Sequence, residues 1–560
     1  MSSMAVGLAE AEMHALAPEP DRDWWRGAVI YQIYPRSFQD SNADGIGDLR
    51  GILMRLPHVA ALGVDAVWIS PFFRSPMRDF GYDVADYCDV DPMFGTLEDF
   101  DAIVAEAHRL GLKVMIDLVL SHTSDEHPWF RASRASRDNP RADWYVWADP
   151  RPDGTPPNNW LSIFGGSAWA WDTRREQYYL HNFLVEQPDL NFHNPEVQDA
   201  LLSATRFWLE RGVDGFRLDT INFYFHSEGL ESNPALPRES RDYSTAPSVN
   251  PYNYQDHIYD KSRPENLGFL QRFRALLDEY PARAAVGEVG DAQRGLEVVA
   301  AYTAGSERIH MCYSFDFLGP VKLTAERVRQ VLEAFGAVAT DGWSCWAVSN
   351  HDVVRTASRW AAGEADPQAY LKIVAALMLS LRGSVCIYQG EELGLAEAEL
   401  AFEDLQDPYG IRFWPEFKGR DGCRTPMVWD SHQPNAGFSA GKPWLPVPAE
   451  HITHAVNTQQ GSEASVLEHY RRMIAFRAAH PALIKGTIRF LAAESDVVAF
   501  ERELGGERLL CAFNLGAGEA KLPLDEGMRV VAIPGHGLDG AHEDGAIRLG
   551  PYGGWFGKRA

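Results

Sequence analysis

The sequence predicts an α/β protein: a (β/α)8 TIM barrel with a subdomain inserted after the third strand and an all-β C-terminal domain. Three observations predict this fold class. Short β-branched or aromatic runs alternate with helical segments from residue 28 onward, which is typical of a parallel sheet. Eight such runs occur before residue 390, and eight parallel strands close a barrel. After residue 480 the pattern changes to short alternating runs separated by Gly-rich turns, as in antiparallel sheets.

The predicted strands are joined mostly by segments long enough for a crossover helix, as parallel pairing requires. In a barrel of this kind the reactive side chains lie at the C-terminal ends of the strands. The polar residues that end each run are therefore the candidates for chemistry. In chain order the runs are 28–34, 64–70, 113–120, 215–222, 283–289, 310–315, 344–350 and 384–389.

Two connections are too long for a simple helical link. About ninety residues separate the third and fourth runs, and 144–172 is rich in Trp, Asn, Gly and Pro, which indicates an inserted subdomain. A second Pro- and Asn-rich insertion, from residue 223 to about residue 265, is placed to cover the barrel mouth. The predicted domains are an N-terminal tail at 1–23, the barrel at 24–120 and 192–480, the subdomain at 121–191 and the C-terminal β domain at 481–560.

Composition excludes several kinds of partner. The 52 basic and 78 acidic residues give a formal charge of −26, which repels nucleic acid and anionic membrane. Six scattered cysteines without a C-x-x-C pair indicate neither a zinc site nor a disulfide framework, and they fit a reducing cytoplasm. Residues 1–20 lack the features of a secretory signal, and the apolar run 373–381 is far short of the roughly 20 residues that span a bilayer. We therefore expect a cytoplasmic protein without a membrane anchor, with the periplasm as an alternative, and the sequence leaves its oligomeric state undetermined.

The fourth run, 215–222, carries an arginine and an aspartate two positions apart in an apolar context. Residues two apart on a strand point to the same face, so Arg217 and Asp219 are expected to project together. An ordinary buried salt bridge gives the same pattern. Polar residues at other strand ends favour a catalytic role, because they converge on one rim of the barrel. These are Asp117 to His122, Glu288, and Asn350 to Asp352.

These segments together resemble the conserved regions of the α-amylase family, glycoside hydrolase family 13. The resemblance covers most of the chain from Trp24 to about Trp429. It implies that Asp219 is the nucleophile, Glu288 the general acid/base and Asp352 the carboxylate that stabilises the transition state. The matching segments are Asp117–His122, Gln187–Asn191, Gly215–Asn222, Gly287–Val289 and Asn350–Asp352.

The chemistry asks for two of these residue types independently. Retaining glycoside hydrolysis needs one ionised carboxylate as nucleophile and one protonated acid, about 5 to 5.5 Å apart. We expect Arg217 to lower the pKa of Asp219 and keep it ionised. We expect Glu288 to keep a raised pKa, since Gly287 and Val289 flank it rather than cations.

The resemblance also implies a set of sugar-binding side chains. Asp83, His122 and His351 are similar to residues that bind hydroxyls in the −1 subsite, although structural hydrogen bonding is the alternative for each. Asp83 is expected to pair with Arg424 and block the site behind the terminal glucose, as in exo-acting α-glucosidases of the family. The segment around Arg424 departs from the family at Gly422–Cys423, where Asn-Ala is common. Tyr82, Arg217 and Thr220 complete the predicted substrate-binding set.

A further segment presents oxygen ligands at alternate positions, as calcium loops do, with a turn glycine at Gly45. Gly51 stands where an EF-hand places its glutamate, so an unoccupied polar turn is the alternative. The segment resembles a loop of bacterial α-glucosidases that holds Ca²⁺ or Mg²⁺, and a structural role is expected. No organic cofactor is expected. The predicted ligands are Asp40, Asn42, Asp44, the Ile46 carbonyl and Asp48.

The residue after the predicted nucleophile bears on linkage. In related enzymes a valine there accompanies α-1,6 preference, and a more polar residue accompanies α-1,4 preference; here it is Thr220. The resulting prediction is a retaining, exo-acting α-glucosidase for maltose-like substrates and sucrose, with transfer of glucose to a sugar or alcohol acceptor. An α-1,6-specific oligoglucosidase and a sucrose- or trehalose-forming isomerase remain as alternatives. A non-enzymatic amylase-like partner protein is disfavoured, because the carboxylate set is complete.

Overall fold

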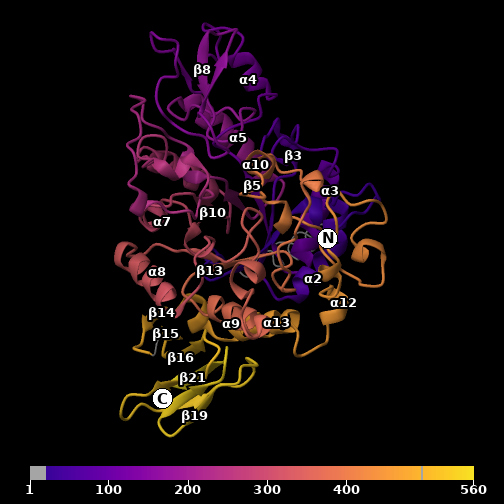
Figure 1. Cartoon of the computed structure of the whole chain (residues 1–560), viewed down its shortest axis with the longest axis vertical. Coiled ribbons are helices and arrows are strands. Elements are labelled where there is room, and N and C mark those ends of the chain that lie inside the picture. Colours follow the sequence, from indigo (N-terminus) through magenta and orange to yellow (C-terminus); the bar gives the residue numbers. More distant parts are fainter. Residues whose placement is uncertain (1–20, 494–495, 560) are drawn as a thin grey trace, which may run out of the picture.

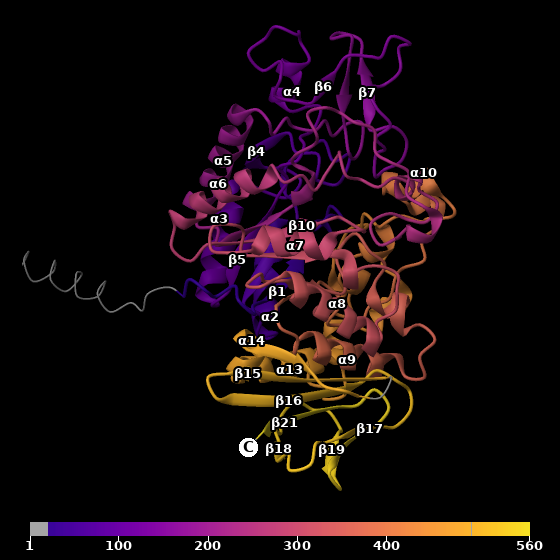
Figure 2. The ribbon, with the colours of Figure 1, turned by 90° about the vertical axis from the view of Figure 1, so that its left-hand side faces the viewer.

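A computed structural model describes residues 21–493 and 496–559 of the chain. The predicted N-terminal tail lies outside these residues, apart from its last three positions. The molecule is elongated: the inserted subdomain stands at one end, the barrel in the middle and the C-terminal β domain, in yellow, at the other end (Figures 1 and 2). Within the described part of the chain, no helix is both long and apolar enough to cross a bilayer.

The central barrel consists of parallel strands in the order β11-β10-β9-β5-β2-β1-β13-β12. A parallel bridge between Cys312 and Ser344 joins the two end strands and closes the ring. Every predicted run contains one of these strands, so the predicted fold class is confirmed. The strands are β1 Val29–Ile33, β2 Ala66–Ile69, β5 Lys113–Leu118, β9 Gly215–Leu218, β10 Ala284–Val289, β11 Met311–Ser314, β12 Cys345–Ala347 and β13 Ser384–Tyr388.

The strand residues are buried on both faces, almost without exception, because helices cover the outside of the barrel and side chains fill its inside. Several helices begin where a Ser, Thr, Asp or Asn side chain accepts a hydrogen bond from a free backbone N–H, as Thr96 and Asn194 do. The covering helices are α2 Leu49–Ala61, α3 Leu97–Arg109, α5 Pro195–Glu210, α6 Asn266–Asp278, α7 Gly295–Thr303, α8 Ala325–Val338, α9 Pro367–Met378 and α13 Val466–Ala479.

The inserted subdomain is a small antiparallel sheet in the order β6-β8-β7 around a Trp-rich core. A bridge between His122 and Asp189 ties its base to the segment after β5, and a bridge between Tyr145 and Leu190 joins two segments within it. The sheet therefore stands directly above the carboxyl ends of the barrel strands. Its elements are α4 Pro128–Ser133, β6 Trp147–Ala148, β7 Trp169–Asp172 and β8 Gln177–Leu180, and the hairpin β3 Phe73–Arg74 with β4 Asp86–Val90 lies beside it.

The C-terminal domain contains a sheet in the order β14-β15-β16-β21-β18 and a smaller sheet in the order β17-β20-β19. Successive residues of its long strands are buried on two faces: Val497, Leu510 and Trp555 form the core of the domain, and Val498 and Phe513 join the cluster that includes the barrel helices. The strands of this domain are β14 Thr487–Phe490, β15 Val497–Leu504, β16 Glu507–Asn514, β17 Ala520–Pro523, β18 Val530–Ala532, β19 Ala541–Glu543, β20 Ala546–Leu549 and β21 Gly554–Arg559. Four short helices precede them in the chain: α10 Pro408–Phe413, α11 Ala449–Ile452, α12 Val456–Gln459 and α14 Pro481–Lys485.

Candidate active site

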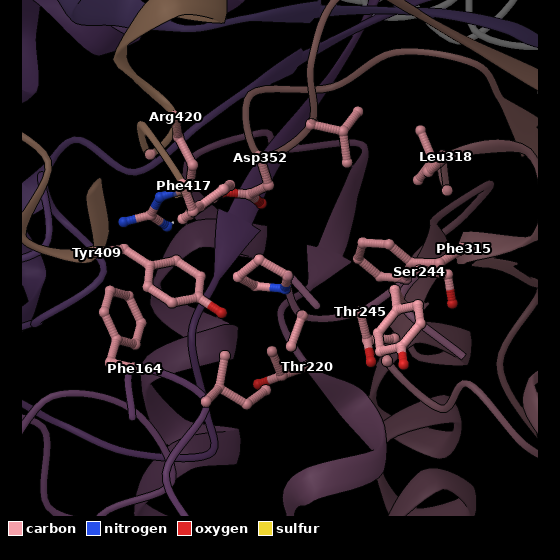
Figure 3. A pocket seen from close by; sticks show the side chains of 18 of the residues that line it. Phe164, Thr220, Ser244, Thr245, Phe315, Leu318, Asp352, Tyr409, Phe417 and Arg420 are labelled. Carbon is pink, nitrogen blue, oxygen red and sulfur yellow. Dashed lines mark hydrogen bonds and ion pairs between the residues drawn. The ribbon is translucent and has the colours of Figure 1, made fainter. Parts of the chain in front are cut away.

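A cavity of about 580 Å³ opens at the carboxyl ends of the barrel strands. This is the size of a small-ligand pocket. Figure 3 shows Phe164, Tyr409 and Phe417 on one side of it and Phe315, Thr245 and Leu318 on the other, with Thr220 between them. The polar side chains at its base are Asp79, Tyr82, His122, Asp219, Glu288, Asp352 and Arg420.

Arg217 gathers three carboxylates beneath the cavity. Its Nη1 lies 2.5 Å from Asp219 Oδ1 and 2.9 Å from Asp117 Oδ1. Its Nη2 lies 2.5 Å from Glu288 Oε2. Strand register explains the grouping: Arg217 pairs with Asp117 on β5 and with Val286 on β10, and Asp219 and Glu288 each follow two positions later on the same face. The predicted same-face pair is therefore part of a larger cluster.

The cluster holds more negative charge than its arginine neutralises. Burial raises the pKa of the Glu288 carboxyl to about 8; Arg217 opposes the rise and Asp219 adds to it. Burial also raises the pKa of Asp219 to about 7 against the attraction of Arg217, with Asp117 adding to the rise. Since one guanidinium cannot compensate three carboxylates, a proton is retained near neutral pH, and Glu288 has the highest affinity for it.

The structure corrects two expectations about the pKa values of these groups: the direction expected for Asp219, and the cause expected for Glu288. Arg217 does not lower the pKa of Asp219 below its ordinary value, because burial and the neighbouring carboxylates outweigh it. Glu288 does have a raised pKa, but a cation touches it, and its pKa rises through burial and charge crowding instead. Sequence neighbours did not reveal this, since the groups that face Glu288 come from other strands.

Thr220 touches both members of the predicted catalytic pair. Its backbone N–H donates to Glu288 Oε2 at 3.1 Å, and its hydroxyl donates to Asp219 Oδ2 at 3.2 Å. The hydroxyl also lies 3.0 Å from the Ser121 hydroxyl. Thr220 adopts φ of 38°, a left-handed conformation that is costly for a β-branched residue and marks a constrained site. The turn after β9 thus aims the N–H at Glu288.

Asp352 occupies a different electrostatic environment on the far side of the cavity base. Its Oδ1 lies 2.9 Å from Arg424 Nη2 and 3.2 Å from Arg420 Nη1. Burial opposes the ionisation of Asp352, but these guanidinium groups, together with the adjacent histidine, outweigh it and hold its pKa well below the ordinary value. Asp352 is therefore ionised, whereas Glu288 is protonated at the same pH.

The ion pair behind the cavity differs from the predicted one. The prediction that Asp83 pairs with Arg424 is wrong: Arg420 Nη2 lies 2.8 Å from Asp79 Oδ1, and both residues line the cavity. Asp83 instead accepts hydrogen bonds from the Ser75 hydroxyl and from the backbone of the turn before it. The true partners stand four residues before the expected ones in both segments.

Arg424 supports the third carboxylate from behind. Its Nε donates to the His351 carbonyl at 2.7 Å, in addition to its contact with Asp352. The departure at Gly422 has a steric cause, because a Cβ there would lie 2.3 Å from a Glu397 carboxylate oxygen and 2.7 Å from the Ala398 carbonyl oxygen. The unusual glycine lets this segment pack closely beneath Asp352.

The remaining predicted sugar-binding residues surround the cluster. Tyr82 and His122 line the cavity. His351 stacks on Tyr82 with ring centroids 5.3 Å apart, and the Tyr82 hydroxyl donates to Asp117 Oδ2 at 3.1 Å. The Gln187 amide nitrogen links two residues that line the cavity: it lies 3.2 Å from Asp79 Oδ2 and 3.1 Å from His122 Nε2. Asp79, Arg420 and Gln187 are thus site residues that the sequence did not single out individually, although each lies in or near a segment that it did.

The family model described as "Alpha amylase, catalytic domain" matches residues 32–486. The chain belongs to the α-amylase family. Among its relatives, "Probable alpha-glucosidase" of Rhizobium meliloti (strain 1021) is 66% identical over 544 residues, covering 97% of this chain and 98% of the relative. "Oligo-1,6-glucosidase" of Heyndrickxia coagulans is 37% identical, covering 88% and 92%.

Two solved structures are similar to this chain over nearly its whole length. The crystal structure of the α-glucosyl transfer enzyme XgtA is 56% identical, with a TM-score of 0.93, and the match covers 96% of this chain and 99% of that one. The trehalulose synthase MutB from Pseudomonas mesoacidophila MX-45 is 33% identical, with a TM-score of 0.85, covering 97% and 100%. Proteins named for glucosidase activity and for glucosyl transfer therefore both resemble this chain along most of its length.

The predicted metal loop, residues 40–48, lies after β1 and does not line the cavity. The Asp40 carboxylate accepts hydrogen bonds from the backbone of residues 42, 43 and 45 and from the Ser439 hydroxyl. Asp48 caps α2 through Gly51 N at 2.7 Å. Across residues 21–493 and 496–559, no three acidic, histidine or cysteine side chains converge as a metal-binding group. The all-oxygen donor set suits Ca²⁺ or Mg²⁺, and its occupancy remains a prediction.

Proposed function

We propose that this member of the α-amylase family is a retaining α-glucosidase that removes single glucose units from short α-glucosides and also transfers them to acceptors. The observation that carries this proposal is the pair Asp219 and Glu288, which share one guanidinium beneath a cavity closed by the Asp79–Arg420 ion pair. The similarity to enzymes named for α-glucoside hydrolysis and for glucosyl transfer supports it.

The strand register supports retention of configuration. Asp219 and Glu288 stand at neighbouring positions of adjacent strands, and adjacent strands lie about 4.8 Å apart. Retaining enzymes need carboxyl groups about 5 to 5.5 Å apart, whereas inverting enzymes leave room for a water molecule between groups about 6.5 to 9.5 Å apart. The register therefore favours the closer arrangement and a covalent intermediate.

In the proposed first step, the Asp219 carboxylate attacks the anomeric carbon while the bond to the leaving oxygen breaks. Glu288 gives its proton to that oxygen, and the ionised Asp352 stabilises the positive charge that develops on the sugar. In the second step the oxygen of water or of an acceptor hydroxyl bonds to the anomeric carbon, and Glu288 accepts the proton that this oxygen loses. Asp219 is then released as a carboxylate, so the charge and proton balance is restored.

The Asp79–Arg420 ion pair supports release of single glucose units. Arg420 is buried and also contacts Asp352 and Asp407, so the pair is held in place rather than mobile at the surface. A chain extending behind the terminal glucose would meet these side chains. The cavity therefore favours a terminal residue over an internal one.

The rest of the cavity supports glucosyl transfer. The second insertion contributes residues 243–248, and Figure 3 shows Ser244 and Thr245 on the same side as Phe315 and Leu318. An apolar wall beside the glucosyl-enzyme disfavours free water and leaves room for an acceptor molecule. A sugar or an alcohol that fits this wall competes with hydrolysis.

Thr220 supports a preference for α-1,4 linkages, because its hydroxyl reaches Asp219 and lines the cavity. The second candidate function is α-1,6 hydrolysis or sucrose isomerisation, which the names of more distant relatives favour. Initial rates on maltose, isomaltose, sucrose, trehalose and maltotriose distinguish these functions, with NMR identification of the first anomer released. We expect maltose to be preferred and α-glucose to appear first. If isomaltose is the best substrate, the predicted α-1,4 preference is wrong. If β-glucose is the first product, the predicted retention of configuration is wrong.

We further propose that residues 40–48 hold Ca²⁺ or Mg²⁺ through Asp40, Asn42, Asp44, the Ile46 carbonyl and Asp48. Oxygen donors from one turn are the ligands that these cations prefer. The loop packs against residues 438–444, since Asp40 N donates to the Phe438 carbonyl and Trp444 N donates to the Gly45 carbonyl. An ion here would stabilise that junction and supply no group to the cavity.

A further inference from the structure

Lys261, in the second insertion, is buried among groups that the proposed mechanism does not use. Its side chain is 2% exposed. The ammonium donates to the Gly290 carbonyl at 2.8 Å and to the Tyr252 hydroxyl at 2.9 Å, and it lies 5.0 Å from the centre of the Phe223 ring. These partners come from three different parts of the chain, so the ammonium joins them.

The Gly290 peptide lies directly after the strand that carries the proposed acid. Gly290 follows Glu288 by two positions and lines the cavity. Asn222, two positions after Thr220, also holds Gly290: its Oδ1 accepts from Gly290 N at 3.0 Å, and its Nδ2 donates to the Gly290 carbonyl at 3.3 Å. The two turns that carry Asp219 and Glu288 are thus linked through Gly290, and Lys261 makes the shorter of the two hydrogen bonds to its carbonyl.

The insertion is joined to this point by a second set of bonds. Ser262 N donates to the Asn222 carbonyl at 2.6 Å, and the Ser262 hydroxyl donates to Asp291 Oδ2 at 2.7 Å. The neighbouring Asn253 amide donates to the Ala246 and Pro247 carbonyls at 3.1 and 2.9 Å. Residues 246 and 247 line the cavity, so this network supports both Gly290 and the part of the cavity wall that the second insertion forms.

The burial of the Lys261 ammonium is not explained by stability alone. Burying an ammonium is costly, and an apolar side chain of similar volume is often no less stable. Burial lowers the pKa of Lys261, and the carboxylates of Asp291 and Asp260 act against this change. Asp260 is in turn held by His257 at 2.6 Å, and the His257 ring stacks on Tyr252. The charge is therefore compensated from both sides, by Asp260 in the insertion and by Asp291, which directly follows Gly290.

We propose that Lys261 is a positioning residue that locks the second insertion onto the Gly290 peptide and thereby sets how often the glucosyl group passes to an acceptor instead of water. This inference rests on the proposed hydrolysis and transfer. With the lock in place, residues 246–247 and Gly290 keep a fixed distance and the acceptor side stays closed to bulk water. Without it, the wall loosens and water gains access.

The test compares Lys261→Met with the wild type on maltose, after the wild type has been shown to hydrolyse maltose and to form transfer products. The measured quantity is the ratio of transfer to hydrolysis, which does not depend on the fraction of folded enzyme. We expect this ratio to fall about tenfold, because small misplacements at a reacting site have effects of this order or larger. Lys521→Met, which changes an exposed lysine in the C-terminal domain, is the matched control and keeps the wild-type ratio.

Tyr252→Phe provides a second variant, since it removes one acceptor of the ammonium and keeps the lysine. It is expected to lower the ratio in the same direction by a smaller factor, and it decides the question if Lys261→Met does not fold. A wild-type ratio in the folded Lys261 variant, or in Tyr252→Phe when the other cannot be purified, overturns the positioning role. Absence of any turnover by the wild type instead rejects the proposed function.

Discussion

The assignment of Glu288 as the acid makes a prediction about pH that can be worked from its surroundings. With a pKa of about 8, this carboxyl is about 90% protonated at pH 7, whereas at its ordinary pKa of 4.5 well under 1% would be. Because the acid form is the active form, kcat/KM is expected to fall as the pH rises through about 8. The raised pKa therefore preserves activity at neutral pH and sets its alkaline limit.

Glu288→Gln tests this assignment directly, because it keeps the shape and removes the proton donor. General acid catalysis typically contributes about 10² to 10⁴-fold, so kcat/KM on maltose is expected to fall within or below this range. A p-nitrophenyl α-glucoside has a good leaving group that needs little protonation, so its glucosylation step is expected to lose much less. The alkaline limb of the glucosylation rate should disappear in the variant.

The assay is kcat/KM for both substrates between pH 5 and 10, with Glu297→Gln on α7 as a matched control outside the cavity. Glu297 does not line the cavity, so its variant should keep the wild-type profile. Equal losses on the two substrates, or an unchanged alkaline limb in Glu288→Gln, would refute the reasoning. The acid would then be another group, or another step would limit the rate.

Three further predictions follow from other parts of the molecule. Asp79→Asn weakens the ion pair with Arg420 and is expected to raise KM for maltose about tenfold or more while longer maltooligosaccharides lose less; an unchanged KM contradicts the closed-pocket interpretation. Thr220→Val removes the hydroxyl near Asp219 and is expected to shift the isomaltose-to-maltose ratio of kcat/KM upward about tenfold, and a constant ratio rejects the role of Thr220 in linkage. Removal of divalent ions with EDTA is expected to lower the Tm and leave the initial rate on maltose unchanged; a constant Tm argues against an ion in residues 40–48.

The polar ends of the strands show how far sequence reasoning reached. Arg217 and Asp219 stand two positions apart, so their common face follows from strand geometry alone. Glu288 and Asp352 were assigned from the resemblance to a family, and the structure brings them to the same cavity. The metal loop remains a prediction at the level of its residue pattern.

The errors have a common physical origin. The pKa of Asp219 depends on burial and on Asp117, a residue of another strand, and no local pattern gives the sum of these effects. The ion pair that closes the cavity required a choice between two arginines four positions apart, and only the path of the backbone decides that Arg420 faces Asp79 while Arg424 turns toward Asp352. The wall formed by residues 243–248 lies in a segment with little regular structure, where hydrophobic period carries no information.

The sequence by itself determined the barrel, its insertions and the chemical type of each catalytic candidate, because periodicity and residue identity are local properties. Tertiary structure alone decided which groups lie in contact. Three carboxylates contact Arg217, two guanidinium groups contact Asp352, and Lys261 contacts the Gly290 carbonyl. These contacts join residues up to 100 positions apart. Their electrostatic consequences depend on distance and burial in space, which the order of residues along the chain does not specify.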